Sequence, residues 1–313
     1  METLKTIPSA IQNLFNIFPL HEFPPVDAGP YKAPPVTAPE LWVHPPRSQQ
    51  DSSTTTEPKS SYNSDLFSSD VECLKWQAYL ALRGVQAIYL RWDIQPEGAL
   101  EGRLPNLRVP MSMALEKDLK MEDDGEGELL PAHLIKEWVD VQVGDLGEFE
   151  GYVDETARDE SRAWIKLLEG DVHAALVVFQ PPEPFSFRKL ISPYTPSTNP
   201  PVESLFTPPL APLTGWGSIL PTYGVRIDRD GVETRYKEAI SALSERLGTD
   251  KWFLGSAKPT PLDALLFAYL HCLLHSKDHT LRFEITRRVN LVAWERRVHG
   301  DVRAAFQPYV KRK

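Results

Sequence analysis

The chain has 313 residues, which is enough for two domains and a sizeable hydrophobic core. Its formal net charge of −9 argues against a general nucleic-acid binder, because such proteins need a basic excess. No apolar run reaches about 18 residues and residues 1–20 lack a secretory signal, so we expect the chain to stay on the cytosolic side of any membrane.

Residues 1–39 are predicted to form a proline-rich, extended arm. Its apolar side chains make an amphipathic patch of one or two helical turns, and such an arm cannot bury them alone. The arm therefore either packs on its own domain or clips onto a partner. The candidate partner-binding residues in it are Leu14, Phe15, Ile17 and Phe18.

The next segment reads strand, helix, strand. Residues 40–44 and 85–92 are predicted strands, and the second carries apolar residues on both faces, as strands of covered parallel sheets do. Between them, residues 71–83 have helical spacing, and Gly84 is typical of the residue after a helix. The polar residues 47–69 are predicted to be a disordered insert. The pattern indicates a βαβ unit with an insert after its first strand.

A third short strand is expected at residues 104–109, with Pro105 at the position where thioredoxin-like folds place a cis-proline. Residues 116–128 read as an acidic loop, and Pro131 is expected to start a helix. After Gly144 the pattern becomes fully helical.

In this helical part, Gly170 and Asp171 are expected to kink a helix that reaches Phe179. Residues 181–221 are a proline-rich stretch without periodicity. We expect it to wrap a surface through aromatic residues, among which Phe185 and Phe187 are further candidate partner contacts. Further helices are predicted at 230–247, 281–289 and 291–298.

Residues 260–275 predict a helix at the centre of the core. Thr260 is a suitable N-cap, Pro261 suits the first helical position, and Asp263 can reach back to the cap as a capping box. The run that follows is apolar on every side, so we expect it to be buried among other helices. The role of Thr260 and Asp263 is predicted to be structural.

Candidate chemical groups are few. His271, His275 and His279 repeat at i, i+4 and i+8, but without suitable carboxylates we favour a core histidine and a solvated helix end over a metal site. Cys73 and Cys272 lie in apolar helical patterns and are predicted to be free buried thiols, with a disulfide as the weaker alternative. The basic C-terminus reads as a solvated face or as a contact for anionic groups.

The order of a small αβ domain, an all-helical domain and a capped buried helix resembles the glutathione-transferase plan. The resemblance implies an α+β/α fold, with a thioredoxin-like domain at 40–145 and an all-helical domain at 146–313. Two segments, residues 72–80 and 252–270, look more specifically like the metaxin family.

Metaxins and their fungal relatives are subunits of the mitochondrial sorting and assembly machinery, which inserts β-barrel proteins into the outer membrane. The resemblance favours the smaller, peripheral subunit on the cytosolic face of the mitochondrial outer membrane. It implies as partners the β-barrel core subunit, a second metaxin-like subunit and β-barrel precursors, whose β-signal the subunit helps to recognise. No cofactor or metal is implied.

Two other functions stay open: a glutathione-dependent transferase and a soluble scaffold of another complex. A transferase needs a hydroxyl or thiol after the first strand, where Ser68, Ser69 and Cys73 are the candidates. Serine is the default cap at such a position, so we expect Ser69 or Asp70 to cap the helix and Cys73 to be buried. The family's contact to the γ-glutamyl group is expected near residues 130–131, which offer neither hydroxyl nor carboxylate. We therefore expect a protein that is not an enzyme.

Overall fold

A computed structural model describes residues 36–46, 66–94, 96–115, 127–179 and 228–308, all within the compact unit Pro35–Lys313. The expected sheet domain and helical domain thus belong to one compact unit. Most of the predicted insert and the proline-rich stretch lie outside the described residues. The same holds for six candidate partner contacts: Leu14, Phe15, Ile17, Phe18, Phe185 and Phe187.

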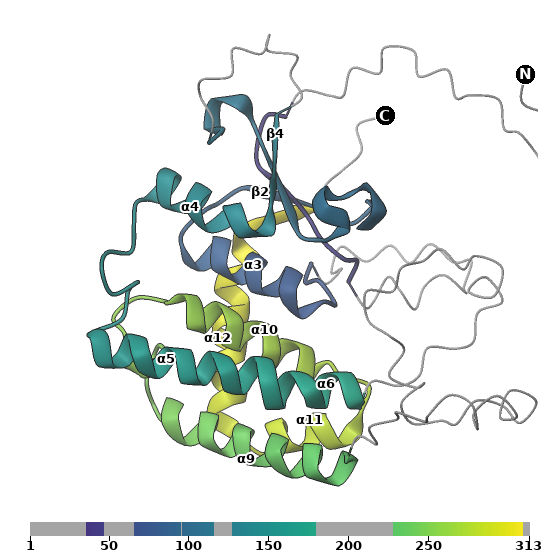
Figure 1. Cartoon of the computed structure of the whole chain (residues 1–313), viewed down its shortest axis with the longest axis vertical. Coiled ribbons are helices and arrows are strands. Elements are labelled where there is room, and N and C mark those ends of the chain that lie inside the picture. Colours follow the sequence, from purple (N-terminus) through teal and green to yellow (C-terminus); the bar gives the residue numbers. More distant parts are fainter. Residues whose placement is uncertain (1–35, 47–65, 95, 116–126, 180–227, 309–313) are drawn as a thin grey trace, which may run out of the picture. The chain divides into compact units, whose positions relative to one another are not determined.

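A mixed sheet of five strands, in the order β4-β3-β1-β2-β5, forms one layer of this unit (Figure 1). β1 and β2 are parallel and joined by α3, so the predicted βαβ unit is present, while β3 and β4 are antiparallel to their neighbours. The strands and the helix are β1 (Glu40–Trp42), α3 (Val71–Leu82), β2 (Ile88–Arg91), β3 (Asn106–Val109), β4 (Glu128–Pro131) and β5 (Phe306–Pro308).

Two of these strands were not predicted. Residues 128–131 form β4, and the helix expected from Pro131 is α4 (Ile135–Val143), which follows a short 3₁₀ turn. β5 pairs in parallel with β2 although only helices were expected after Gly144, and its Phe306 is buried. Both strands are too short to show a period of two, so their pairing with neighbours decides their structure.

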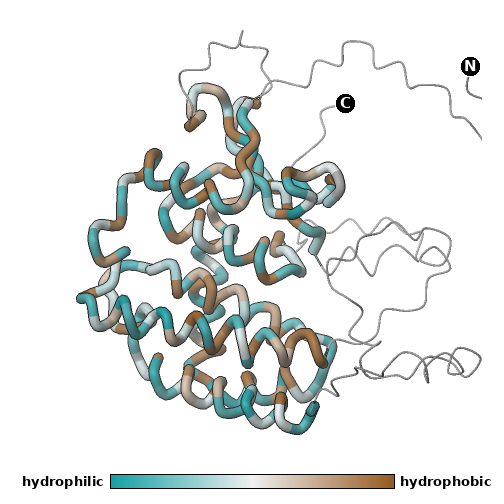
Figure 2. Tube along the Cα trace, in the orientation of Figure 1, coloured by the Kyte–Doolittle hydropathy of each residue, from teal (hydrophilic) through white to brown (hydrophobic). Residues whose placement is uncertain are grey.

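The helical layer contains α5 (Glu155–Leu167), α6 (His173–Val178), α9 (Arg229–Leu247), α10 (Pro261–Leu274), α11 (His279–Thr286) and α12 (Val289–Ala304). A π-helical turn at Leu168–Val172 joins α5 to α6 where a kink was predicted, because an extra residue interrupts the regular bonding. Figure 2 shows α5 as mostly hydrophilic, as suits a helix with one face in water.

α10 is the centre of the core. Nearly all of its side chains are buried, and it packs on α3, α5, α11 and α12, as the all-round apolar run predicted. A capping box joins Thr260 to Asp263. The Asp263 carboxylate accepts the backbone N–H of Phe253 at 2.8 Å, the backbone N–H of Thr260 at 2.7 Å and the Thr260 hydroxyl at 2.8 Å. One buried carboxylate therefore fixes both the start of α10 and the turn before it.

Candidate functional site

The connection from β1 to α3 holds the serines considered as transferase residues. Ser68 is 2% exposed. Its hydroxyl donates to the carbonyl of His44 at 2.9 Å, and the hydroxyl of Ser69 donates to the carbonyl of Pro45 at 2.9 Å. Of the two residues expected to be able to cap the helix, Ser69 and Asp70, the cap is Asp70, which accepts the N–H of Cys73 at 2.9 Å. Both serines thus fasten the connection to the end of β1.

Cys73 lies in the first turn of α3 and is 0% exposed. Burial, together with the nearby negative charge of Asp70, raises the pKa of its thiol well above the ordinary range. The thiol form therefore dominates at neutral pH, and a thiol is a poor nucleophile. The other cysteine, Cys272, is also buried and unbridged.

We expect neither cysteine to react with iodoacetamide in the native protein at pH 8, whereas both react after denaturation. A cysteine introduced at the exposed position Thr286 (Thr286→Cys) should react at an ordinary rate and serves as the control. Mass spectrometry of the alkylated peptides measures all three. Rapid alkylation of native Cys73 would contradict its assignment as a buried packing residue.

The remaining transferase landmarks lie at β3 and at the start of α4. The Leu104–Pro105 bond is cis, at the position that the resemblance indicates. Residues 129–135, which lead from β4 into α4, contain no Ser, Thr, Asp or Glu. His133 there is exposed, and its imidazole lies 3.9 Å from the Glu101 carboxylate. The position expected to hold a γ-glutamyl group therefore carries neither hydroxyl nor carboxylate.

The three histidines do not converge on one site. α10 ends at Leu274, so His279 starts α11 and stacks on Phe283 instead of continuing the same helix face. His271 is buried and its Nδ1 lies 2.8 Å from Glu295 Oε1 on α12, a partner that sequence spacing did not indicate. Within residues 36–46, 66–94, 96–115, 127–179 and 228–308, no group of three His, Cys, Asp or Glu side chains is placed to hold a metal ion.

A pocket of about 290 Å³ opens where α3 and α4 face α5 and α10. Its floor is apolar, formed by Ile165, Pro261, Ala264 and Leu265. Its aromatic wall is formed by Trp76, Tyr79 and Tyr152, and the rings of Trp76 and Tyr79 meet edge to face at 5.5 Å. An apolar floor with aromatic walls suits an apolar side chain of a partner.

The rim of the pocket carries charges of both signs. Lys75 is bound by Glu72 at 2.6 Å, and Lys136 is bound by Glu150 at 2.5 Å, a hydrogen bond that raises the pKa of Lys136. Glu169 is exposed. The rim can therefore orient a partner without favouring one sign of charge strongly.

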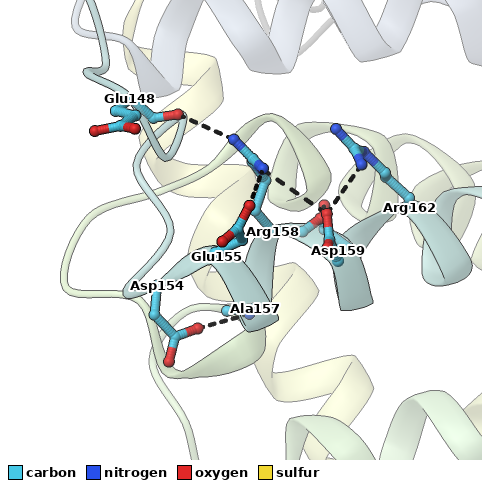
Figure 3. Close-up of polar contacts among 8 residues, drawn as sticks. Glu148, Asp154, Glu155, Ala157, Arg158, Asp159 and Arg162 are labelled. Atoms are coloured by element: carbon cyan, nitrogen blue, oxygen red, sulfur yellow. Dashed lines mark hydrogen bonds and ion pairs between the residues drawn. The ribbon is translucent and has the colours of Figure 1, made fainter.

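The α5 side of the rim is stiffened by a local arginine network (Figure 3). Asp154 caps α5 by accepting the N–H of Ala157 at 2.7 Å. Arg158 donates to Glu155 at 3.0 Å, and Arg162 at the rim donates to Asp159 at 2.9 Å. The bond to Asp159 orients Arg162 at the rim.

Three hydroxyl groups line the pocket. Its one hydroxyl from serine, Ser161, donates to the carbonyl of Arg158 at 2.6 Å. Burial raises the pKa of Tyr79 and of Tyr152, so both phenols stay protonated at neutral pH. Trp76 is half-buried, packs against the core and also lines the pocket. The residues that line the pocket are far apart in the sequence, so the spacing of residues alone did not predict the pocket.

Comparison with known proteins finds a family match within the helical part. Residues 236–298 match the family described as glutathione S-transferase, C-terminal domain. No curated protein sequence matches the chain.

Solved structures similar to the chain include a β-etherase and two proteins described as glutathione transferases or family members. The β-etherase LigF of Sphingobium has 14% identity, covers 85% of this chain and 97% of its own, and gives a TM-score of 0.45. A glutathione S-transferase of Methylobacterium radiotolerans, in complex with glutathione sulfonate, has 13% identity, covers 88% and 99%, and gives 0.43. A transferase family member of Pseudomonas fluorescens, with two glutathione bound, has 12% identity, covers 84% and 87%, and gives 0.39.

The chain has a glutathione-transferase-like fold. A thioredoxin-like mixed sheet region precedes a helical region, and the family match falls on α9 to α12 in that region. The predicted fold class is confirmed. Among the described residues, no helix combines the length and the apolar character that crossing a bilayer needs.

Proposed function

We propose that this protein is a non-enzymatic, metaxin-like subunit of the mitochondrial outer-membrane sorting and assembly machinery. In this role it lies on the cytosolic face of the membrane. It binds the β-barrel core subunit and a second metaxin-like subunit, and it helps to recognise the β-signal of β-barrel precursors.

The proposal that the protein is not an enzyme rests on one observation. All three candidate catalytic groups already have structural roles. Ser68 and Ser69 bond carbonyls at the end of β1, and Cys73 is buried with a raised pKa. A hydroxyl that already donates to a backbone carbonyl is not available to stabilise a thiolate. This arrangement supports a transferase-like fold that serves as a scaffold.

The specific resemblance to metaxins is supported by where its two segments lie. Residues 72–80 fall on α3, and residues 252–270 contain most of α10. These two helices pack against each other more extensively than any other pair of elements. The two metaxin-like segments therefore share one interface in the middle of the fold.

The pocket between α3, α4, α5 and α10 is the proposed docking site for an apolar side chain of the β-barrel core subunit. Its aromatic wall and apolar floor supply the contact area, and its rim of lysines and glutamates orients the partner. The proposed mechanism is binding, with no covalent step.

Affinity capture from mitochondria solubilised in mild detergent, followed by mass spectrometry, tests this proposal. We expect recovery of a β-barrel outer-membrane protein and of a second metaxin-like chain. Trp76→Ala should reduce that recovery, whereas Trp164→Ala should not. The two tryptophans are matched, since each indole N–H donates at 3.0 Å to a glutamate four residues earlier, but only Trp76 lines the pocket.

The outcomes separate the parts of the proposal. Equal capture by both variants would remove the pocket from the interface and leave the function standing. A protein found wholly in the cytosol, without either partner, would contradict the mitochondrial role and favour a scaffold of another complex. Retention on glutathione resin together with thiol-dependent turnover would favour the transferase.

A further inference from the structure

α11 and the turn that leads into α12 carry a surface that the proposed function does not use. We call it the α11–α12 corner and define it by six residues: His279, Arg282, Phe283, Arg287, Arg288 and Val289. None of these six residues lines the pocket between α3, α4, α5 and α10.

Two large apolar side chains protrude at this corner. Phe283 is 53% exposed, and Val289 is 77% exposed, the highest value among the exposed large apolar residues of the described ranges. His279 stacks on the Phe283 ring at 5.8 Å, and the Arg287 guanidinium lies 5.8 Å from the same ring. The phenylalanine ring is therefore about half-exposed and lies beside two polar side chains.

The charges at the corner are positive, against the overall charge of −9. Between residues 279 and 300 the only acids are Glu284 and Glu295, and both are buried. The Glu284 carboxylate pairs with Arg287 at 3.2 Å and with Arg288 at 3.3 Å. Glu295 pairs with His271 in the core. Solvent along this stretch thus meets arginines and no carboxylate.

We propose that the α11–α12 corner is a contact site for the surface of an anionic lipid bilayer. Arginines attract acidic headgroups, and an exposed Phe and Val can enter the boundary between headgroups and acyl chains. An acidic peptide is less well matched, because side chains exposed to this degree protrude and do not form a groove in which a peptide backbone can lie. The inference does not depend on the proposed partners.

Co-sedimentation of the full chain with vesicles tests the proposal. Vesicles of phosphatidylcholine with about 20% phosphatidylserine should bind the protein at low salt, and vesicles of phosphatidylcholine alone should bind it at least tenfold less. Arg282→Gln should weaken binding about fivefold, the effect expected of one basic residue near an anionic surface. Phe283→Ala should weaken it by a similar factor.

Matched variants control for general charge and general hydrophobicity. Lys166→Gln removes an exposed cation on α5, and Val153→Ala shortens an exposed apolar residue before α5; neither should change binding. Replacing Lys311, Arg312 and Lys313 together by Gln measures the contribution of the basic C-terminal residues separately.

A fluorescent label locates the contact directly. Because Cys73 and Cys272 are buried, Phe283→Cys offers one accessible thiol for an environment-sensitive dye, and Val153→Cys is its control. We expect a blue shift with anionic vesicles only at position 283. The proposal is overturned by equal binding to neutral vesicles, by unchanged binding of Arg282→Gln and Phe283→Ala, or by binding to polyglutamate without binding to vesicles.

Discussion

Asp263→Ala should lower the free energy of unfolding by about 2 to 4 kcal/mol at pH 7. The side chain accepts two backbone N–H groups and one hydroxyl, and all three donors are in the core. Alanine leaves these donors without a partner, and each unsatisfied buried donor costs about 1 to 3 kcal/mol. Loss of the carboxylate's own desolvation cost offsets part of this effect. Urea denaturation followed by circular dichroism measures the difference.

Asp278→Ala is the matched control. Asp278 also caps a helix, since it accepts the N–H of Leu281 at 3.0 Å at the start of α11. It lies nearer the surface and supports no second segment, so its loss should cost about 1 kcal/mol. Equal losses in the two variants would show that the bond from Asp263 to the Phe253 turn adds no stability.

The same carboxylate gives stability an unusual dependence on pH. Burial raises the pKa of Asp263 to about 6 from its ordinary value of 3.8, even though three hydrogen bonds oppose the shift. Between these values the folded chain holds a proton that the unfolded chain has released. Stability contributed by this group is therefore full below about pH 4 and falls as the pH rises to about 6, by about 3 kcal/mol.

Other carboxylates give the stability of the fold the opposite dependence on pH. The Arg246 guanidinium lowers the pKa of Glu160, and a lowered pKa gives stability that is lost as the pH falls. The informative quantity is therefore the difference between the wild type and Asp263→Asn, measured from pH 4 to pH 7, because asparagine does not titrate. Parallel pH profiles for the two proteins would contradict a raised pKa at Asp263.

The elements that the sequence predicted well are those with strong local signals. Thr260, Pro261 and Asp263 predict the start of α10, and the apolar run after them is too long to be a strand. Helical spacing, with Gly84 at the end, predicts α3. Gly84 has a φ of 88°, the left-handed region that the residue after a helix adopts. In both cases the local preference and the tertiary packing agree.

The candidate site was less predictable, for a physical reason. Its residues come from α3, α4, α5, α10, the segment before α5 and the π-helical turn after it, and only the packing of these elements brings them together. Serines before a helix are usually read as caps, yet Ser68 and Ser69 bond carbonyls more than twenty residues earlier in the chain. Glu295, the partner of His271, lies on a different helix, so periodicity within one helix did not indicate it.

β5 links the end of the helical region to the sheet. This strand follows all the helices of the described residues and pairs with β2, so the sheet is complete only when the two ends of a long stretch of chain have come together. Such a distant pairing slows folding, since a long loop must close before the contact forms. It also makes unfolding cooperative: the helices cannot separate from the sheet while Phe306 stays beside Ile88, so one transition should be seen by probes in both layers.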